Sequence, residues 1–110
     1  MPDLSTVTTF QKNVYELLLQ VPKGKVTTYK DIAHTLGTRA YRGVGRALQC
    51  NPYAPTVPCH RVVASDGSIG GFQGKRDGSP IVKKIELLKK EGVSVENGRI
   101  IGFGEKRHQF

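Results

Sequence analysis

The run Cys59-His60-Arg61 contains three residue types that can act together in nucleophilic chemistry. A cysteine is a strong nucleophile only as a thiolate, and a free thiol has a pKa of about 8.5. His60 can accept the thiol proton, and Arg61 can supply positive charge that favours the thiolate. The run therefore indicates Cys59 as a candidate nucleophile. The alternative is a buried, inert thiol beside a hydrogen-bonded histidine.

The segment around this run, 57–63, is of β type and predicts a short strand. Neighbouring side chains on a regular strand point to opposite faces, so Cys59 and His60 would not touch directly. Either the segment bends or a water molecule carries the proton between the two side chains. An acidic residue would also be needed to orient the imidazole.

Upstream of this segment, the pattern predicts two short helices, about 28–36 and 39–50, joined by Gly37-Thr38. This spacing is typical of a helix-turn-helix. Arginines gather on one face of the second helix, opposite an apolar face, and two glycines weaken it. The residues concerned are Arg39, Tyr41, Arg42, Gly43, Val44, Gly45, Arg46 and Leu48. The two helices indicate a motif whose second helix faces nucleic acid. The alternative is two packed helices with a solvated basic side.

The composition fits one small domain with an anionic partner. The chain has 110 residues, 17 Lys plus Arg and 9 Asp plus Glu, so 17 − 9 gives a formal charge of +8. Such a charge favours nucleic-acid binding, although it could serve solubility alone. No apolar run approaches the roughly 18 residues of a membrane span, and the first ten residues lack a secretory pattern. Two cysteines are too few for a disulfide scaffold, so we expect an intracellular domain without a membrane partner.

The remaining pattern predicts helices with short β elements between them. Thr8 and Gln11 have capping-box spacing before a helix over about 9–21, which Pro22 ends. Further along, the pattern predicts an extended piece at Val26-Thr27, a second helix capped by Thr28, a turn at Asp66-Gly67 and an irregular stretch over 68–73.

The last helix is expected to be capped by Ser79, with Pro80 at its first position and a stop at Gly92. Its apolar stripe is Ile81, Ile85 and Leu88 with Leu87 alongside, and its solvated flanks carry Lys83, Lys84, Lys89 and Lys90. A hairpin over 93–101 around Asn97-Gly98 and a frayed tail complete the prediction.

Four segments in this order resemble the O6-alkylguanine-DNA alkyltransferases. They are GKVTTYKDIA (24–33), RAYRGVGRALQCNP (39–52), VPCHRVVASDGSIGGFQG (57–74) and IELLKKEG (85–92). The resemblance covers about residues 8–92 without obvious gaps. It implies the catalytic C-terminal domain of the family, a mainly α, winged helix-turn-helix-like DNA-binding domain. Many members carry another domain in front, whereas only about seven residues precede the first helix here.

The resemblance also implies roles for the acceptor site. Cys59 falls at the alkyl acceptor, His60 at a base that acts through a bridging water, and Glu91 at the carboxylate that orients the histidine. Asn51 matches an asparagine that buttresses the site. Tyr29 matches a tyrosine beside the extruded base, the candidate proton donor to the leaving guanine. The resemblance implies no cofactor and no metal.

The resemblance also implies which residues contact DNA. Arg42 matches an arginine that enters the duplex and replaces the flipped nucleotide. The family binds the minor groove, so weak sequence specificity is expected, and Gly43 and Gly45 would permit close approach to the DNA walls. The remaining residues expected at the DNA are Thr28, Arg39, Tyr41 and Arg46.

The substrate pocket is implied by a third group of residues. The carbonyls of Cys59 and Val62 would read the guanine amine, and Lys84 matches a lysine near the pocket; Arg61 is placed there too. A lid over about 70–80 would include Phe72, Gln73 and Gly74. Some members have Tyr-Ser where this chain has Phe72-Gln73, which alters the expected tolerance for large alkyl groups.

Together these features predict a DNA repair protein that flips O6-alkylguanine out of double-stranded DNA and transfers the alkyl group irreversibly to its own Cys59. We expect a monomer, cytoplasmic or, in a eukaryote, nuclear. One alternative is an alkyltransferase-like binder, although those relatives have another residue, often Trp, in place of the cysteine. The other is a helix-turn-helix regulator without chemistry, which would leave PCHR and Glu91 unexplained. Cys50 is interpreted as a packing residue.

Overall fold

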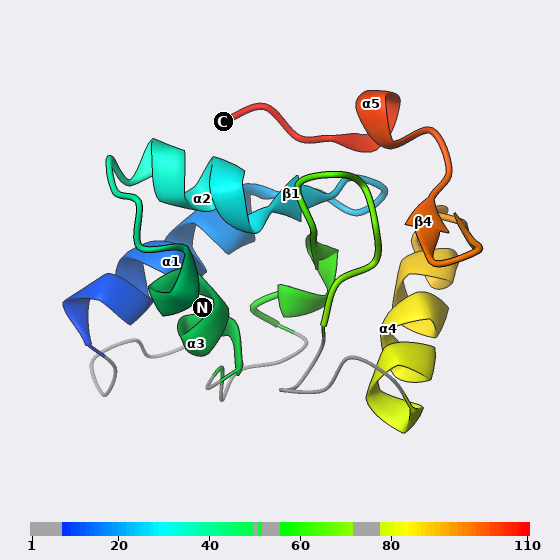
Figure 1. Cartoon of the computed structure of the whole chain (residues 1–110), viewed down its shortest axis with the longest axis horizontal. Coiled ribbons are helices and arrows are strands. Elements are labelled where there is room, and N and C mark those ends of the chain that lie inside the picture. Colours follow the sequence, from blue (N-terminus) through cyan, green and yellow to red (C-terminus); the bar gives the residue numbers. More distant parts are fainter. Residues whose placement is uncertain (1–7, 50, 52–55, 72–77) are drawn as a thin grey trace.

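The computed structural model describes residues 8–49, 51, 56–71 and 78–110 (Figure 1). Its helices are α1 Thr9–Gln20, α2 Tyr29–Thr35, α3 Tyr41–Gln49, α4 Ser79–Lys90 and α5 Phe103–Lys106, with a 3-10 turn, η1, at Cys59–Arg61. Its strands are β1 Thr27–Thr28, β2 Val62–Val63, β3 Val95–Glu96 and β4 Arg99–Ile100. This arrangement confirms the expected mainly α fold with short β elements and a helix-turn-helix. Within the described residues, no helix is long and apolar enough to cross a membrane.

Helix α1 begins where its sequence signal predicts. The Thr8 hydroxyl accepts a hydrogen bond from the Gln11 amide at 3.1 Å, and the Gln11 side chain accepts one from the Thr8 amide at 3.1 Å. This reciprocal capping box satisfies two amides that lack intrahelical partners. The side chains of Val14, Tyr15 and Leu18 are buried and form the core-facing side of the helix.

Helix α2 is positioned by its N-cap. The Thr28 hydroxyl accepts from the Asp31 amide at 3.0 Å, as predicted for a Thr cap. Beyond the other end, Gly37 has φ +71°, the left-handed conformation expected of a residue after a helix C-terminus. The first helix of the predicted pair is therefore confirmed with both of its end signals.

The connection between α2 and α3 is longer than the predicted two residues. It covers 36–40, and α3 begins only at Tyr41, so the prediction that Arg39 lies on the second helix was wrong. The Thr38 hydroxyl accepts from the Ala40 amide at 3.1 Å. Such side-chain-to-backbone bonds compete with helical pairing and favour a turn.

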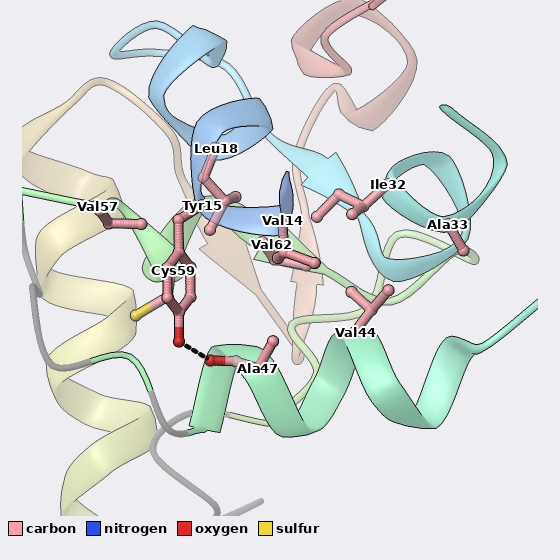
Figure 2. Packing of buried hydrophobic residues seen from close by; sticks show 10 residues of the cluster. All are labelled: Val14, Tyr15, Leu18, Ile32, Ala33, Val44, Ala47, Val57, Cys59 and Val62. Atoms are coloured by element: carbon pink, nitrogen blue, oxygen red, sulfur yellow. Dashed lines mark hydrogen bonds between the residues drawn. The ribbon is translucent and has the colours of Figure 1, made fainter. Parts of the chain in front are cut away.

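The main core lies where α1, α2, α3 and the segment 57–62 meet (Figure 2). Its members are Val14, Tyr15, Leu18, Ile32, Ala33, Val44, Ala47, Val57, Cys59 and Val62. The Tyr15 hydroxyl donates to the Ala47 carbonyl at 2.6 Å inside this cluster, which ties the last turn of α3 to α1 (Figure 2). Cys59 is therefore part of the hydrophobic core of the helix-turn-helix.

A short parallel sheet links the helix-turn-helix to the cysteine segment. Thr27 of β1 pairs with Val62 of β2, and Thr28 pairs with Val63. Both strands lie between the α1–α3 group and α4 in Figure 1. The pairing brings the N-terminus of α2 beside the end of η1, although the two are about thirty residues apart in the chain.

A second buried cluster holds α4 and the hairpin, with Val26, Val63, Leu88, Val93 and Ile100 as members. The hairpin β3–β4 pairs Val95 with Ile100 and turns through Asn97 and Gly98, both at positive φ. The predicted hairpin around these two residues is confirmed, as is the stop of α4 at Gly92, which has φ +86°.

Three local predictions were wrong. The segment 57–63 is not one strand, because its middle forms η1 and only Val62–Val63 is extended. Ser79 is the first residue of α4 and not its cap; Gly78 occupies the cap position at φ +78° without a side-chain hydrogen bond. The tail is not frayed, since α5 and the following residues pack back over β1 and α2 (Figure 1).

Candidate alkyl-acceptor site

Cys59 lies at the start of η1, where the chain changes from the core segment to β2. The turn is closed by two backbone hydrogen bonds, Cys59 N to Val57 O at 2.9 Å and Arg61 N to Pro58 O at 3.0 Å. This is the bend that the sequence required if Cys59 and His60 were to work together. Successive side chains on a 3-10 turn diverge by about 120°, so the two point in different directions.

Cys59 is a free cysteine, and only 7% of the residue's surface is exposed. Burial raises the pKa of this thiol, while a hydrogen bond from Asn51 and the positive charge of Lys84 act in the opposite direction. The net shift leaves the thiol protonated at neutral pH. A base is therefore needed to generate the nucleophile.

His60 is buried beside Glu91 at the C-terminus of α4. Its Nε2 lies 3.1 Å from Glu91 Oε1, the contact expected from the need for an orienting carboxylate. Burial lowers the pKa of His60, and the charge of Glu91 only partly offsets this effect. The imidazole is therefore neutral at pH 7. With Nε2–H directed to Glu91, Nδ1 remains as the proton acceptor.

Glu91 is also held by Arg61. Arg61 Nε donates to Oε1 at 2.9 Å, Nη2 donates to Oε2 at 2.6 Å, and Nη1 donates to the Val21 carbonyl at 2.7 Å. Burial opposes the charge of Glu91, but the bonds and charges of Arg61 and His60 hold the pKa of its carboxyl below the ordinary value. The expectation that Arg61 favours the thiolate directly was wrong, because its guanidinium faces Glu91 and Val21.

Lys84 lies in a different environment from the one that the helical spacing predicted. It was expected on a solvated flank of the last helix, yet its side chain is completely buried. Its Nζ donates to three carbonyls: Val62 O at 2.7 Å, Ile69 O at 2.6 Å and Gly71 O at 2.9 Å. Burial lowers the pKa of Lys84 to about 7, and the charge on Cys59 acts to raise it. The prediction of a solvated flank was therefore wrong, while the place of Lys84 near a substrate pocket, implied by the resemblance, stays a prediction.

Asn51 and Tyr29 border the same region. Asn51 Nδ2 donates to the Val57 carbonyl at 2.9 Å, which braces the residue that precedes Pro58. Tyr29, at the start of α2, is half-buried. A Cβ on Gly70 would come within 3.4 Å of the Tyr29 hydroxyl, and Gly70 also has φ +69°. The positive φ, and not the contact with Tyr29, is what favours glycine at position 70.

The exposed face of α3 carries the residues expected at DNA. Arg42 and Arg46 are exposed, and Tyr41 is 41% exposed with its hydroxyl 3.3 Å from His34 Nε2. Arg39 is exposed in the turn before the helix. Thr28 is instead fully buried and its hydroxyl is used as the N-cap of α2.

The two glycines of α3 differ in the space available for a side chain. A Cβ on Gly43 would come within 3.3 Å of the Phe10 ring, so the ring would have to shift by a few tenths of an ångström to admit a side chain there. A Cβ on Gly45 would have open space around it. Only Gly45 lacks a reason inside the fold, and the role of both at DNA stays a prediction.

Some predicted residues lie outside the described residues, namely Cys50, Phe72, Gln73 and Gly74. In the part of the chain that the structure describes, no group of three or more His, Cys, Asp or Glu side chains could hold a metal ion. The described site therefore consists of Cys59, His60, Glu91, Arg61, Lys84, Asn51 and Tyr29.

Known proteins resemble this chain in sequence and fold. Residues 9–93 match the profile of the family described as "6-O-methylguanine DNA methyltransferase, DNA binding domain". A methylated-DNA–protein-cysteine methyltransferase of Methanosarcina barkeri is 45% identical over 80 residues, 72% of this chain and 51% of the relative. The chain spans about half the length of several such curated relatives.

Solved structures agree with this match. The O6-methylguanine-DNA methyltransferase of Pyrococcus kodakaraensis has a TM-score of 0.70 and 47% identity, covering 83% of this chain and 50% of that one. Schizosaccharomyces pombe Atl1, solved with damaged DNA containing O6-carboxymethylguanine, has a TM-score of 0.77 and 32% identity, covering 92% of this chain and 95% of that one. From the extent of the family match, this chain belongs to the 6-O-methylguanine DNA methyltransferase family, as a form of its DNA-binding domain.

Proposed function

We propose that this chain repairs O6-alkylguanine in double-stranded DNA by moving the alkyl group to its own Cys59, once per chain. The observation that carries the proposal is the set of buried contacts around Cys59, in which His60 is held by Glu91 and a lysine lies under the same segment. An inert packing thiol needs neither a neutral, oriented imidazole nor a buried lysine nearby.

The proposed reaction is a direct displacement. His60 accepts the Cys59 proton through a bridging water, because the two side chains diverge on η1. The thiolate then attacks the alkyl carbon, so that a sulfur–carbon bond forms as the carbon–O6 bond breaks. Guanine leaves as an anion and takes up a proton from the Tyr29 hydroxyl; solvent then returns a proton to the tyrosinate, and the His60 imidazolium releases the thiol proton to solvent. The thioether product has no easy leaving group, which makes the reaction irreversible.

The target base lies inside a stacked duplex, so it must be extruded before the thiol can reach it. In this proposal α3 enters the minor groove, Arg42 takes the place of the extruded nucleotide, and a monomer binds with weak sequence specificity. The exposed arginines of α3 and the formal charge of +8 support binding to phosphates. Structures of relatives in complex with DNA are consistent with this partner.

A second candidate function is binding without transfer. It is favoured by the match to Atl1, which extends over nearly the whole of both chains, whereas the methyltransferases are matched over about half. The presence of Cys59 favours transfer, since the resemblance implies another residue at that position in non-catalytic binders. The two functions differ in one observable, the covalent state of Cys59 after reaction.

Intact-protein mass spectrometry after incubation with a duplex containing O6-methylguanine tests the choice. Transfer adds one methylene mass, about 14 Da, to Cys59. The matched control is Cys59→Ser, which should bind the same duplex and gain no mass. Tight binding by the native chain without a mass gain would establish the non-catalytic function instead.

A further inference from the structure

Lys84 has a buried amino group without a carboxylate partner among the described residues. It is fully buried, and only three backbone carbonyls receive its hydrogen bonds. Carbonyl dipoles satisfy the three N–H groups but supply no negative charge. Since burial of an unpaired charge is costly, proteins usually retain one only where a charge of opposite sign is needed or formed.

The geometry determines what Lys84 cannot do. All three of its N–H donors are used by Val62, Ile69 and Gly71, so a direct bond to a leaving guanine would require it to give up one of them. Because Val62 directly follows η1, the ammonium is fixed under the segment that carries Cys59.

The other charged groups near the thiol are already paired. Arg61 and His60, both on η1, are directed to Glu91, the C-cap residue of α4, which leaves Lys84 as the basic group within the described site that can respond to a thiolate. Asn51, on the remaining neighbouring segment, is uncharged and contributes a hydrogen bond to the thiol. A Cys59 thiolate would therefore form against the charge of Lys84.

We propose that Lys84 is a positioning residue of the acceptor site: its three carbonyl bonds fix a buried amino group whose protonated form stabilises the Cys59 thiolate. This role is additional to the alkyl transfer proposed above, and its use in repair rests on that function. The interaction is mutual, so formation of the thiolate equally stabilises the ammonium. Permanent alkylation of Cys59 would remove this partner from Lys84.

The test measures the thiol without any DNA. In a Cys50→Ser background, Cys59 is the only thiol of the chain. Its rate of reaction with iodoacetamide between pH 6 and 10 reports the thiolate population. We expect Lys84→Met to shift the profile upward by about one pH unit and to slow the reaction at pH 7 about tenfold. The matched control is Lys83→Met, an exposed neighbour on α4, which should leave the profile unchanged. Coincident profiles for the two variants would overturn the proposal.

A second measurement does not depend on the folding of Lys84→Met. Lysine side-chain NMR follows the titration of Lys84 in the native protein and in Cys59→Ser. Loss of the thiolate should lower the pKa of Lys84, and an unchanged pKa would overturn the proposal. A native chain that shows both thiol effects but gains no alkyl mass from DNA would overturn the proposed function alone.

Discussion

The acceptor site and the exposed face of α3 differ in whether their charged side chains have partners inside the protein. At the acceptor site, His60, Arg61, Glu91 and Lys84 all have internal partners, and each of these partners is at least partly buried. On the α3 side, the side chains of Arg39, Arg42 and Arg46 make no hydrogen bond or ion pair with the described residues. The first region is preorganised, while the second has its donors directed to solvent.

This difference has a consequence for function. A preorganised site loses chemistry and stability together when one partner is removed, because the remaining group stays buried without compensation. An exposed basic face can be altered without effect on the fold, since its charges are solvated in the free protein. Substitutions in the two regions should therefore separate transfer chemistry from DNA engagement.

The largest effect is expected from Glu91→Gln. This change leaves Arg61 without its counter-ion and His60 without its carboxylate, so the free energy of unfolding should fall by about 2–4 kcal/mol. Transfer from free O6-methylguanine base and from duplex DNA should both slow about a hundredfold. Urea unfolding and single-turnover kinetics measure the two quantities. Glu86→Gln, an exposed glutamate on the same helix, is the control, and equal behaviour of the two variants would refute the role of Glu91.

Arg42→Ala should affect only the function of the exposed face of α3, which is engagement of duplex DNA. If Arg42 replaces the extruded nucleotide, transfer from duplex DNA should slow about tenfold or more because flipping costs a few kcal/mol. Transfer from the free base and the stability of the fold should stay unchanged, since the side chain is exposed. Comparison of the two substrates with one enzyme preparation measures this split. Equal losses on both substrates would contradict a role in flipping.

A smaller effect concerns the pH dependence of stability. Burial lowers the pKa of Lys84 to about 7, whereas its ordinary value is 10.5. Between these values the unfolded chain binds a proton that the folded chain has released, so stability rises with pH. Above pH 9 the raised pKa of Cys59 opposes this gain. We expect roughly 1–3 kcal/mol of additional stability from pH 7 to pH 9 in urea unfolding. Lys84→Met should abolish the rise, and a persistent slope in that variant would exclude Lys84 as its source.

The smallest effect belongs to the C-terminal segment. Arg107 Nε donates to Asp31 Oδ2 at 2.8 Å, and Nη2 donates to Oδ1 at 2.5 Å, across the first turn of α2. These bonds hold the pKa of Asp31 below its ordinary value. Because Arg107 is 38% exposed, Arg107→Ala should cost only about 0.5–1 kcal/mol. A double-mutant cycle with Asp31→Asn isolates the pair, and additive losses would show that the two residues do not interact.

Local signals made much of the fold predictable. The Thr8 and Thr28 caps, the glycines at 37 and 92, and the Asn97-Gly98 turn each act through atoms within a few residues, so their effect can be read from the chain. The failures also have local causes. Gly78 took the cap position expected for Ser79, and the Thr38 hydroxyl stabilised a turn where a helix from residue 39 was expected.

The tail shows the limit of local reasoning. Its residues carry no apolar periodicity, so fraying was the natural prediction. In the fold, the Val26 amide donates to the Lys106 carbonyl at 2.8 Å and the His108 amide donates to the Val26 carbonyl at 2.7 Å. Hydrogen bonds between such distant backbone segments leave no pattern in either segment.

By itself, the sequence indicated Cys59 and His60 as candidate nucleophile and base, the need for an acidic partner, and a basic helix; the choice of Glu91 as that partner came from the family resemblance. Residue type limits the available chemistry, and the match of four segments to one family gave their order. Only the tertiary structure determined the charge pairing: Arg61 faces Glu91, and the buried Lys84 donates to the carbonyl of Val62, three residues after Cys59. Burial and pairing set protonation states, and both depend on side chains brought together from η1 and α4 across about twenty to thirty residues of chain.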